Sequence, residues 1–350
     1  MIVITSPEND TRPQRVPWRR MAWVSWRQHR IALAGVAVFV GALAVCLWLA
    51  GVKTHHVYAA AIAACHPVTS AACGGMFTTI IGTNGFLSNG FILQAVPALI
   101  GAFVGAPVLA RELETGTFRY AWTQGFGRWR WTLAKLVPLA VTVAAAAGAL
   151  SVLLSWYYRP YFAAGNQNLG LPEMTPFFPG VFDLRGVAFA AWTLTAFAIG
   201  ALAGMLIRRV VPAMVATLTG YAALAFATGG FLRQYYLSPL VTSNPNVPES
   251  AWIYSQWGTR NGTFAYAGSP PDALVTRFCP FGPSTPATVL PKPKIDTLAQ
   301  CLAQHGYTQW TSYQPASRFW AFQWIEGGWL LALSALLIAV TVWLVQRRAA

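Results

Sequence analysis

Six apolar stretches without a single Asp, Glu, Lys or Arg constrain this 350-residue chain more than any other feature. They are Ile31–Gly51, Ile92–Ala110, Leu136–Trp156, Gly186–Ile207, Val211–Phe231 and Gly328–Val345. An α-helix rises about 1.5 Å per residue, so each stretch can cross a hydrocarbon layer of about 30 Å with its backbone hydrogen bonds satisfied. A helical protein in water would carry charges on the faces that meet the solvent. The sequence therefore predicts an all-α membrane protein with six transmembrane helices.

The distribution of Lys and Arg orients this predicted bundle. If the helices alternate in direction, one side of the membrane carries 1–30, 111–135, 208–210 and 346–350, which hold 15 of the 24 basic residues. Basic residues in short loops stay in the cytoplasm, so we expect a multi-pass protein of the plasma membrane with both termini inside. The net charge of +14 then follows largely from topology. It predicts contact with anionic lipid and no nucleic-acid partner.

The cysteines agree with this orientation. Cys65 and Cys73 fall in the first predicted outside loop, Cys279 and Cys301 fall in the last one, and Cys46 lies within a span. An oxidising exterior favours disulfides, and four cysteines allow three pairings. We expect Cys65 with Cys73 and Cys279 with Cys301, because each pair closes a local loop. Histidines near the first pair have no acidic neighbour and match no zinc spacing, so no metal is predicted.

The amino-terminal segment 1–30 changes character along its length. A polar, proline-punctuated leader is followed by tryptophans and arginines that alternate. This pattern predicts an amphipathic helix at the level of the lipid headgroups, with tryptophan and arginine anchors. The predicted interfacial anchors are Trp18, Arg19, Arg20, Trp23 and Trp26. The alternative is a basic flank that only fixes the orientation of the first span.

The hairpin 111–135 between the second and third spans is the most informative polar segment. Gly116 and the glycines at 125 and 127 are helix stops, so Thr117–Gln124 can form a short helix of about two turns. Phe118 and Trp122 are four positions apart and would share one face of that helix. An aromatic face in the cytoplasm indicates a partner surface or the bilayer interface. The alternative is a solvated basic loop.

At these residues the sequence resembles the permease subunits of type-2 ATP-binding-cassette exporters, particularly the actinobacterial kind. The resemblance is carried by the basic, Trp-rich segment 18–30, by the hairpin from Arg111 to Lys135, and by the count of six spans. It implies that the hairpin carries a coupling helix that sits in a groove of a separate ATPase subunit. It also implies that two permease copies pair around a translocation path, each served by one ATPase. The residues that would meet or support the ATPase are Arg111, Glu112, Glu114, Gly116, Phe118, Arg119, Trp122, Arg128 and Lys135.

The segment 232–327 between the last two spans departs from the short outside connection of simpler members of that family. It comprises 96 residues with many prolines and several aromatics, so we expect a loop-rich extracytoplasmic subdomain stapled by the second cysteine pair. It would act as a lid or release surface, or else as a structural cap. The predicted organisation is 1–30 leader and interfacial helix, 31–231 five spans, 232–327 external subdomain, and 328–350 sixth span and basic tail.

Absent motifs narrow the function further. The chain has no Gly-x-x-x-x-Gly-Lys-Ser/Thr phosphate loop and no hydrolase motif, so it is not expected to be an enzyme or to bind a cofactor. The apolar stretches hold no ionisable group, which disfavours a proton- or sodium-coupled carrier. We predict the permease subunit of an ATP-driven exporter of a hydrophobic or amphipathic compound. The alternative is a membrane scaffold or sensor whose external subdomain binds a ligand.

Overall fold

The computed structural model describes residues 18–64, 90, 92–116, 127–165, 175–248, 250–279 and 292–348. It is mostly helical, and six of its helical segments are long and apolar enough to cross a membrane. These segments are Ala34–Ala64, Ala95–Thr115, Arg128–Ala163, Gly186–Ile207, Val210–Tyr235 and Ala316–Arg347. Each contains most or all of one charge-free stretch, so the predicted six-span helical fold is confirmed.

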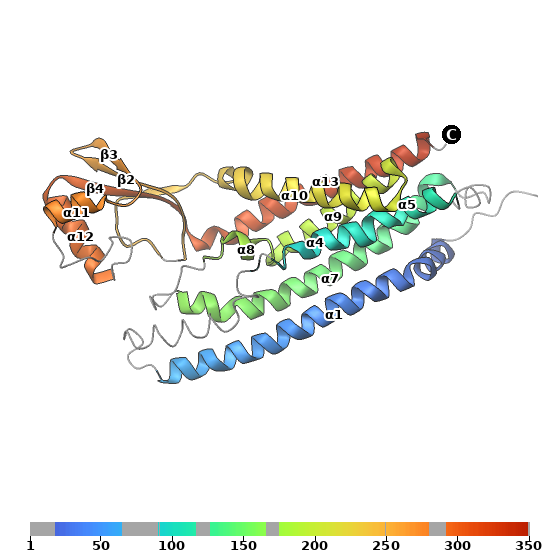
Figure 1. Ribbon diagram of the computed structural model, residues 1–350, viewed down its shortest axis with the longest axis horizontal. Coiled ribbons are helices and arrows are strands. Elements are labelled where there is room, and N and C mark those ends of the chain that lie inside the picture. The colour runs from blue at the N-terminus through green and yellow to red at the C-terminus, as the bar shows by residue number, and fades with distance from the viewer. Residues whose placement is uncertain are drawn as a thin grey trace, which may run out of the picture.

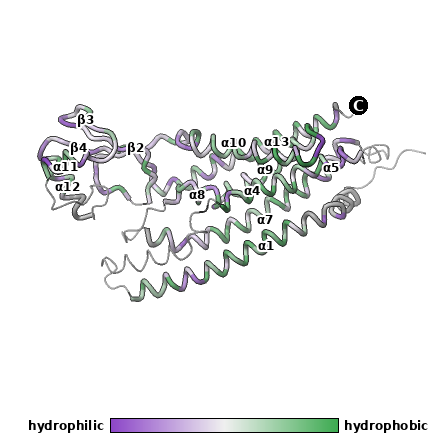
Figure 2. Tube along the Cα trace, viewed as in Figure 1, coloured by the Kyte–Doolittle hydropathy of each residue, from purple (hydrophilic) through white to green (hydrophobic). Residues whose placement is uncertain are grey.

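The helices run side by side along the long axis of the molecule, and a small sheet lies beyond one end of them (Figure 1). The helical elements up to the sheet are α1 (Trp18–Ala64), α4 (Ala95–Ile100), η1 (Gly101–Gly105), α5 (Ala106–Thr115), α7 (Arg128–Gly165), α8 (Pro179–Phe182), α9 (Gly186–Ile207), α10 (Val210–Ala227), η2 (Thr228–Leu232) and η3 (Arg233–Tyr235). The last span is α13 (Phe319–Arg348), preceded by the 3-10 turn η5 (Ala316–Arg318). Apolar residues dominate the length of the bundle, and hydrophilic residues gather at its ends and in the sheet (Figure 2).

Helix α9 is the centre of the bundle. It packs against α13, α7, α10 and the second span, which is built from α4, η1 and α5. Its buried face includes Trp192, Phe197 and Ala201. By contrast, α1 packs mainly on α7 and leaves most of its surface uncovered, as expected for a helix that faces lipid or another chain. The fold thus surrounds one apolar helix with four others.

The second span approaches α9 very closely. A Cβ added at Gly101 would lie 2.5 Å from the Ala196 carbonyl oxygen, and one at Gly105 would lie 2.5 Å from that of Phe197. On α9, a Cβ at Gly200 or Gly204 would collide with the backbone of the second span. Small residues allow such contact, which supplies packing energy that the apolar surroundings do not provide. In the same region, the backbone hydrogen bonds of the second span change from the α-helical pattern to the wider π-helical pattern of η1.

A four-stranded antiparallel sheet occupies much of the segment between α10 and α13. Its strands, in the order β1-β4-β2-β3, are β1 (Leu240–Thr242), β4 (Tyr307–Gln314), β2 (Trp252–Arg260) and β3 (Thr263–Ala267). Helices α11 (Asp272–Phe278) and α12 (Lys292–Gln304) follow β3, and α12 packs on β4. The segment is therefore more regular than the loop-rich subdomain expected from its prolines.

A local turn explains the β2–β3 hairpin. Asn261 and Gly262 both have positive φ angles, 47° and 85°, as the two-residue turn of a tight hairpin requires. The strands carry Trp, Tyr and Thr, which fit a pleated and half-buried surface. An aromatic cluster that includes Phe177, Phe319 and Phe322 packs with Trp252 of β2 and joins the sheet to the bundle.

Candidate functional site

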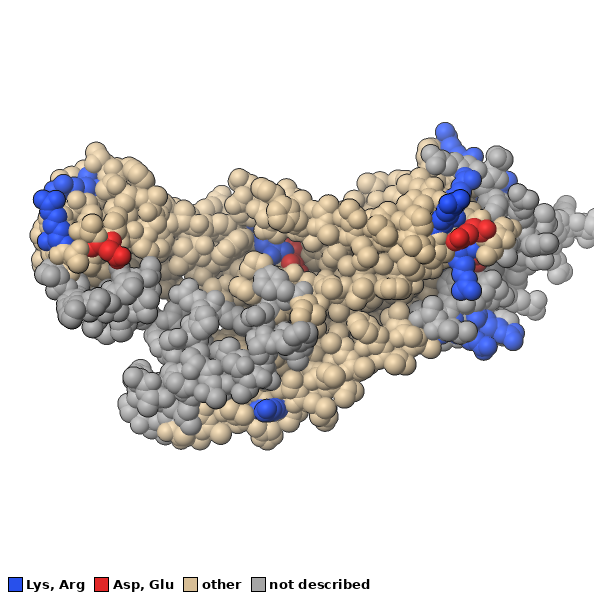
Figure 3. All heavy atoms as spheres, in the orientation of Figure 1, with Lys and Arg blue, Asp and Glu red and all other residues tan. Residues whose placement is uncertain are grey.

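Charged side chains of the described residues gather at the two ends of the molecule, and basic and acidic atoms also meet in a recess near its middle (Figure 3). We call the end of the helical bundle at which α13 finishes, at Arg348, the tail end. We call the opposite end of the helical bundle, where it joins the four-stranded sheet, the sheet end. The predicted hairpin residues lie at the tail end. A second group of charges, which sequence reasoning did not single out, lies at the sheet end.

At the tail end, the hairpin is held by a nearly buried ion pair. The Lys135 ammonium of α7 donates to the Glu112 carboxylate of α5, and these side chains are 5% and 15% exposed. The ammonium also lies 4.2 Å from the centre of the Trp131 ring, a cation–π contact. Helix α5 stops at Gly116, whose φ of 71° is the left-handed conformation that glycine adopts most readily. The predicted helix stop is confirmed.

Two further hydrogen bonds tie the hairpin to the last two spans. The exposed Glu114 carboxylate accepts the backbone N–H of Val210, in the first turn of α10, at 3.1 Å. It therefore caps a helix that has no side-chain cap at its own N-cap residue, Arg209. Arg128, at the start of α7, donates to the Gln346 carbonyl of α13 at 3.3 Å. The two ends of the hairpin thus contact α10 and α13.

The structure brings together only part of the predicted coupling set. Glu112 and Lys135 contact each other, and Glu114 and Arg128 contact neighbouring helices, whereas Arg111 is exposed at the side of α5. Phe118, Arg119 and Trp122 lie outside the described residues. Their shared aromatic face stays a prediction.

The predicted amino-terminal anchors are also only partly described by the structure. Helix α1 runs without interruption from Trp18 to Ala64, so the predicted interfacial segment and the first span form one helix. The side chains of Trp18, Arg19, Arg20, Trp23 and Trp26 lie outside the described part of the structure. Their contact with lipid headgroups stays a prediction.

At the sheet end, a buried cluster joins one basic and two acidic side chains. Arg233 of η3 donates from Nε to Glu326 Oε2 at 2.9 Å and from Nη2 to Glu326 Oε1 at 2.8 Å. Its Nη2 also donates to Asp183, which ends α8. The Arg233 and Glu326 side chains are 2% and 0% exposed. Three segments far apart in the sequence therefore meet through one guanidinium.

Neighbouring groups complete this cluster. The Trp192 indole of α9 donates to Glu326 Oε1 at 2.9 Å, and the Gln94 amide donates to Asp183 Oδ2 at 3.4 Å. The guanidinium carbon of Arg233 lies 4.2 Å from the centre of the Phe182 ring. Burial raises the pKa of the Asp183 carboxyl above its usual range, because its lost hydration outweighs the attraction of Arg233. The cluster thus pairs a buried cation with one carboxylate by two hydrogen bonds and with a second, weaker acid.

The charge-free stretches are why sequence reasoning missed this cluster. Asp183, Arg233 and Glu326 each lie two or three positions beyond the end of a stretch, so they counted as loop residues. The helices extend past the stretches, and the spans Val210–Tyr235 and Ala316–Arg347 include Arg233 and Glu326. A usable signal was present. All three residues flank spans on the same predicted side of the membrane. Their charges are therefore expected at a similar depth relative to the membrane, where they can meet.

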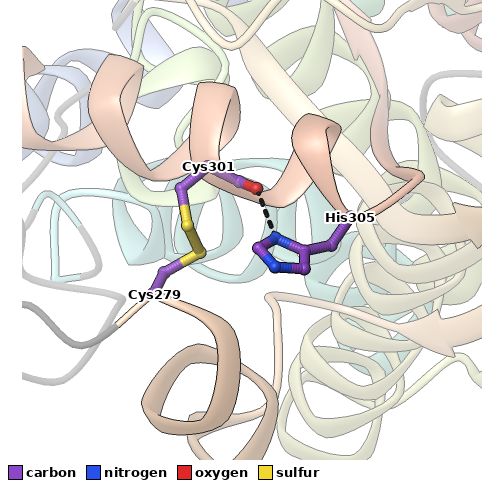
Figure 4. Close-up of side chains that lie close together, drawn as sticks. All are labelled: Cys279, Cys301 and His305. Carbon is purple, nitrogen blue, oxygen red and sulfur yellow. Dashed lines mark hydrogen bonds between the residues drawn. A yellow bond between two sulfur atoms is a disulfide. The ribbon is translucent and has the colours of Figure 1, made fainter.

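The second predicted cysteine pair is confirmed. Cys279, after α11, and Cys301, in α12, form a disulfide whose Cα atoms are 6.0 Å apart. His305 lies beside it, with Nδ1 3.0 Å from the Cys301 carbonyl oxygen (Figure 4). Among the described residues these three could approach a metal ion, but both sulfurs are bonded to each other. Cys65 and Cys73 lie outside the described residues, so their pairing stays a prediction.

The architecture and the two charged regions define a polytopic helical membrane protein with a mixed α/β subdomain at one end. The chain matches the family described as ABC-2 membrane transporter related over residues 36–233, more than half of its length, and it belongs to that family. The match spans the first five membrane helices and the hairpin. Neither the curated proteins nor the solved structures compared with this chain gave a match.

Proposed function

We propose that this chain is the permease subunit of an ATP-driven exporter, and that a separate ATPase subunit drives it through the hairpin 111–135. The match to the family described as ABC-2 membrane transporter related supports the permease role. Two copies would pair around the path, with both termini and the hairpin on the cytoplasmic side of the plasma membrane. The cargo would be hydrophobic or amphipathic, because the spans are lined by apolar side chains.

The observation that carries the coupling part of this proposal is the set of contacts at the base of the hairpin. Glu112 binds Lys135, Glu114 binds the first turn of α10, and Arg128 binds the last turns of α13. A force applied to the hairpin would therefore reach α5, α7, α10 and α13 together. In the proposed mechanism, ATP binding draws two ATPases together, and these contacts pass the displacement to the spans, which expose the path to alternate sides.

The neighbouring reading frame is the first test. An adjacent ATPase with a phosphate loop supports export. An adjacent kinase or regulator in place of an ATPase would instead favour the scaffold hypothesis.

The decisive experiment replaces Phe118 and Trp122 by Ser in the full chain, co-expressed with its ATPase. We expect loss of most ATPase co-purification and of substrate-stimulated ATP hydrolysis in membranes, because the aromatic face that would fill the groove is removed. The matched control is Phe264→Ser, which removes an aromatic ring that is 69% exposed on β3 at the other end of the molecule. Unchanged co-purification of the double variant would remove the hairpin from the docking role.

A further inference from the structure

Arg185 differs from the buried Arg233 of the sheet end, because the described residues offer its guanidinium no acceptor. Arg185 Nε and Nη1 are buried without a hydrogen-bond partner in the described part of the chain. Arg233, in contrast, is matched by Glu326 and Asp183. Buried N–H groups of a charged side chain are costly to leave unmatched, so the difference calls for a physical explanation.

Aromatic rings fix the position of this side chain. The Arg185 guanidinium carbon lies 4.3 Å from the centre of the Phe162 ring and 5.1 Å from that of Phe319. Phe162 belongs to the end of α7 and Phe319 begins α13, so two helices hold the cation from their own ends. Such cation–π contacts hold a planar guanidinium in place without using its N–H groups as hydrogen-bond donors.

The side chain is also charged, and it is not fully enclosed. Nε and Nη1 are buried, but Arg185 as a whole residue is only partly buried, so part of its surface is open. Burial lowers its pKa to about 10, and the nearby Tyr158 favours the charged form, so the side chain remains a cation at neutral pH. The position directly precedes the span α9, where the apolar surfaces of the bundle begin.

We propose that Arg185, held between Phe162 and Phe319, anchors a binding site for the anionic headgroup of an amphipathic molecule, a phosphate or a carboxylate on an apolar tail. The headgroup would accept hydrogen bonds from the guanidinium, whose Nε and Nη1 have no acceptor among the described residues, and would offset the charge that no described carboxylate neutralises. The tail would lie along the neighbouring spans. This site does not depend on an ATPase, so it can fail or hold independently of the proposed transport function.

Binding to the purified full chain in a neutral detergent tests the site. The probes are dilauroyl phosphatidylglycerol, dodecanoate and, as a zwitterionic comparison, dilauroyl phosphatidylcholine. We expect Arg185→Gln to weaken binding of at least one anionic probe about tenfold and to leave phosphatidylcholine unchanged, because a charge-assisted contact is lost. The control is Arg277→Gln, which removes one exposed positive charge from α11 and should change nothing.

The probes also distinguish the possible sources of the anion. A loss confined to phosphatidylglycerol assigns the site to a bilayer lipid, and a loss confined to dodecanoate assigns it to a single-chain amphiphile. Competition by inorganic phosphate shows whether the headgroup alone is recognised or the tail is needed as well.

A structural role for Arg185 would give a different pattern. If Arg185→Gln lowers the thermal unfolding midpoint, Arg185→Lys keeps the charge and should retain more anion binding than Gln at equal stability. Equal affinity of the wild type and both variants for each anionic probe would overturn the proposal. An equal loss for phosphatidylcholine would overturn it as well, because recognition would then not depend on charge.

Discussion

The two ends of the bundle hold their charges in different ways. At the sheet end, Arg233 and Glu326 are almost completely buried and share two hydrogen bonds, and Trp192 adds a third to the carboxylate. At the tail end, Glu114 is exposed and the Glu112 side chain is partly open to solvent. Removing one partner of a fully buried pair costs about 3–5 kcal/mol, and the cost is smaller where water can reach the partner that remains, as at Glu112.

This difference separates a fixed end from an adjustable one. A buried, fully partnered cluster resists rearrangement, because any opening leaves a charge without water or a partner. Contacts that water can partly reach break and form again at a lower cost than fully buried ones. The tail end therefore has the properties that a coupling joint needs, and the sheet end has those of a clamp that joins α8, η3 and α13.

The largest expected effect tests the clamp. Replacing Glu326 by Gln leaves the buried Arg233 with only the weaker Asp183 interaction, so we expect a loss of about 3 kcal/mol in stability. The measurement is the thermal unfolding midpoint of the full chain in detergent. Asp183→Asn should cost less, because Asp183 contacts Arg233 through one oxygen only and its side chain is 22% exposed.

The control for this prediction lies at the other end of the molecule. Glu114→Gln also neutralises a carboxylate, but an exposed one whose amide replacement can still accept the Val210 N–H. Its unfolding midpoint should stay close to that of the wild type. If Glu326→Gln proved as mild as Glu114→Gln, the contrast between the two ends would be wrong.

An intermediate effect tests the Glu112–Lys135 pair. Lys135 is 4% exposed as a residue, whereas the Glu112 side chain is 15% exposed. Glu112→Gln therefore leaves a buried cation with weakened compensation and should cost about 2 kcal/mol, and Lys135→Met leaves a carboxylate that water can reach and should cost about 1 kcal/mol. Thermal unfolding of the two variants, side by side, measures this asymmetry.

A larger loss of stability for Lys135→Met than for Glu112→Gln would show that the Glu112 carboxylate is the less hydrated partner of the pair. A double variant, Glu112→Gln with Lys135→Met, provides the reference, because it removes both charges together. It should be no less stable than Glu112→Gln alone.

The six spans could be predicted because lipid imposes one simple rule on every residue of a crossing helix. Charge is excluded from each stretch, so composition alone located Gly186–Ile207 to the residue and the other spans to within one or a few turns. The ends of the spans are harder to predict, because charged residues are allowed there. Helices α7 and α13 continue past their apolar stretches, because buried partners can satisfy polar groups there.

The sheet and the charge cluster needed different information. The Asn261-Gly262 pair is a strong hairpin signal when strands flank it, and attention to the prolines of the segment concealed that signal. The pairing of Arg233 with Glu326 joins residues 93 positions apart, so no local pattern specifies it. Of the coupling set, the Gly116 stop was readable locally, whereas the contact of Glu114 with α10 depends on how the helices pack.

The smallest expected effect concerns that contact. Glu114→Ala removes the acceptor that caps α10 and should cost about 1 kcal/mol, whereas Glu114→Gln keeps an acceptor and should restore most of it. Because α10 has no cap at Arg209, the loss should also be local. We expect the Val210 amide to exchange its hydrogen faster in the Ala variant, as measured by hydrogen exchange and mass spectrometry of peptides that include it. Unchanged exchange would mean that the tail end does not rely on the hairpin to hold α10. The proposed path from the hairpin to the spans would then have to run through Lys135 and Arg128 alone.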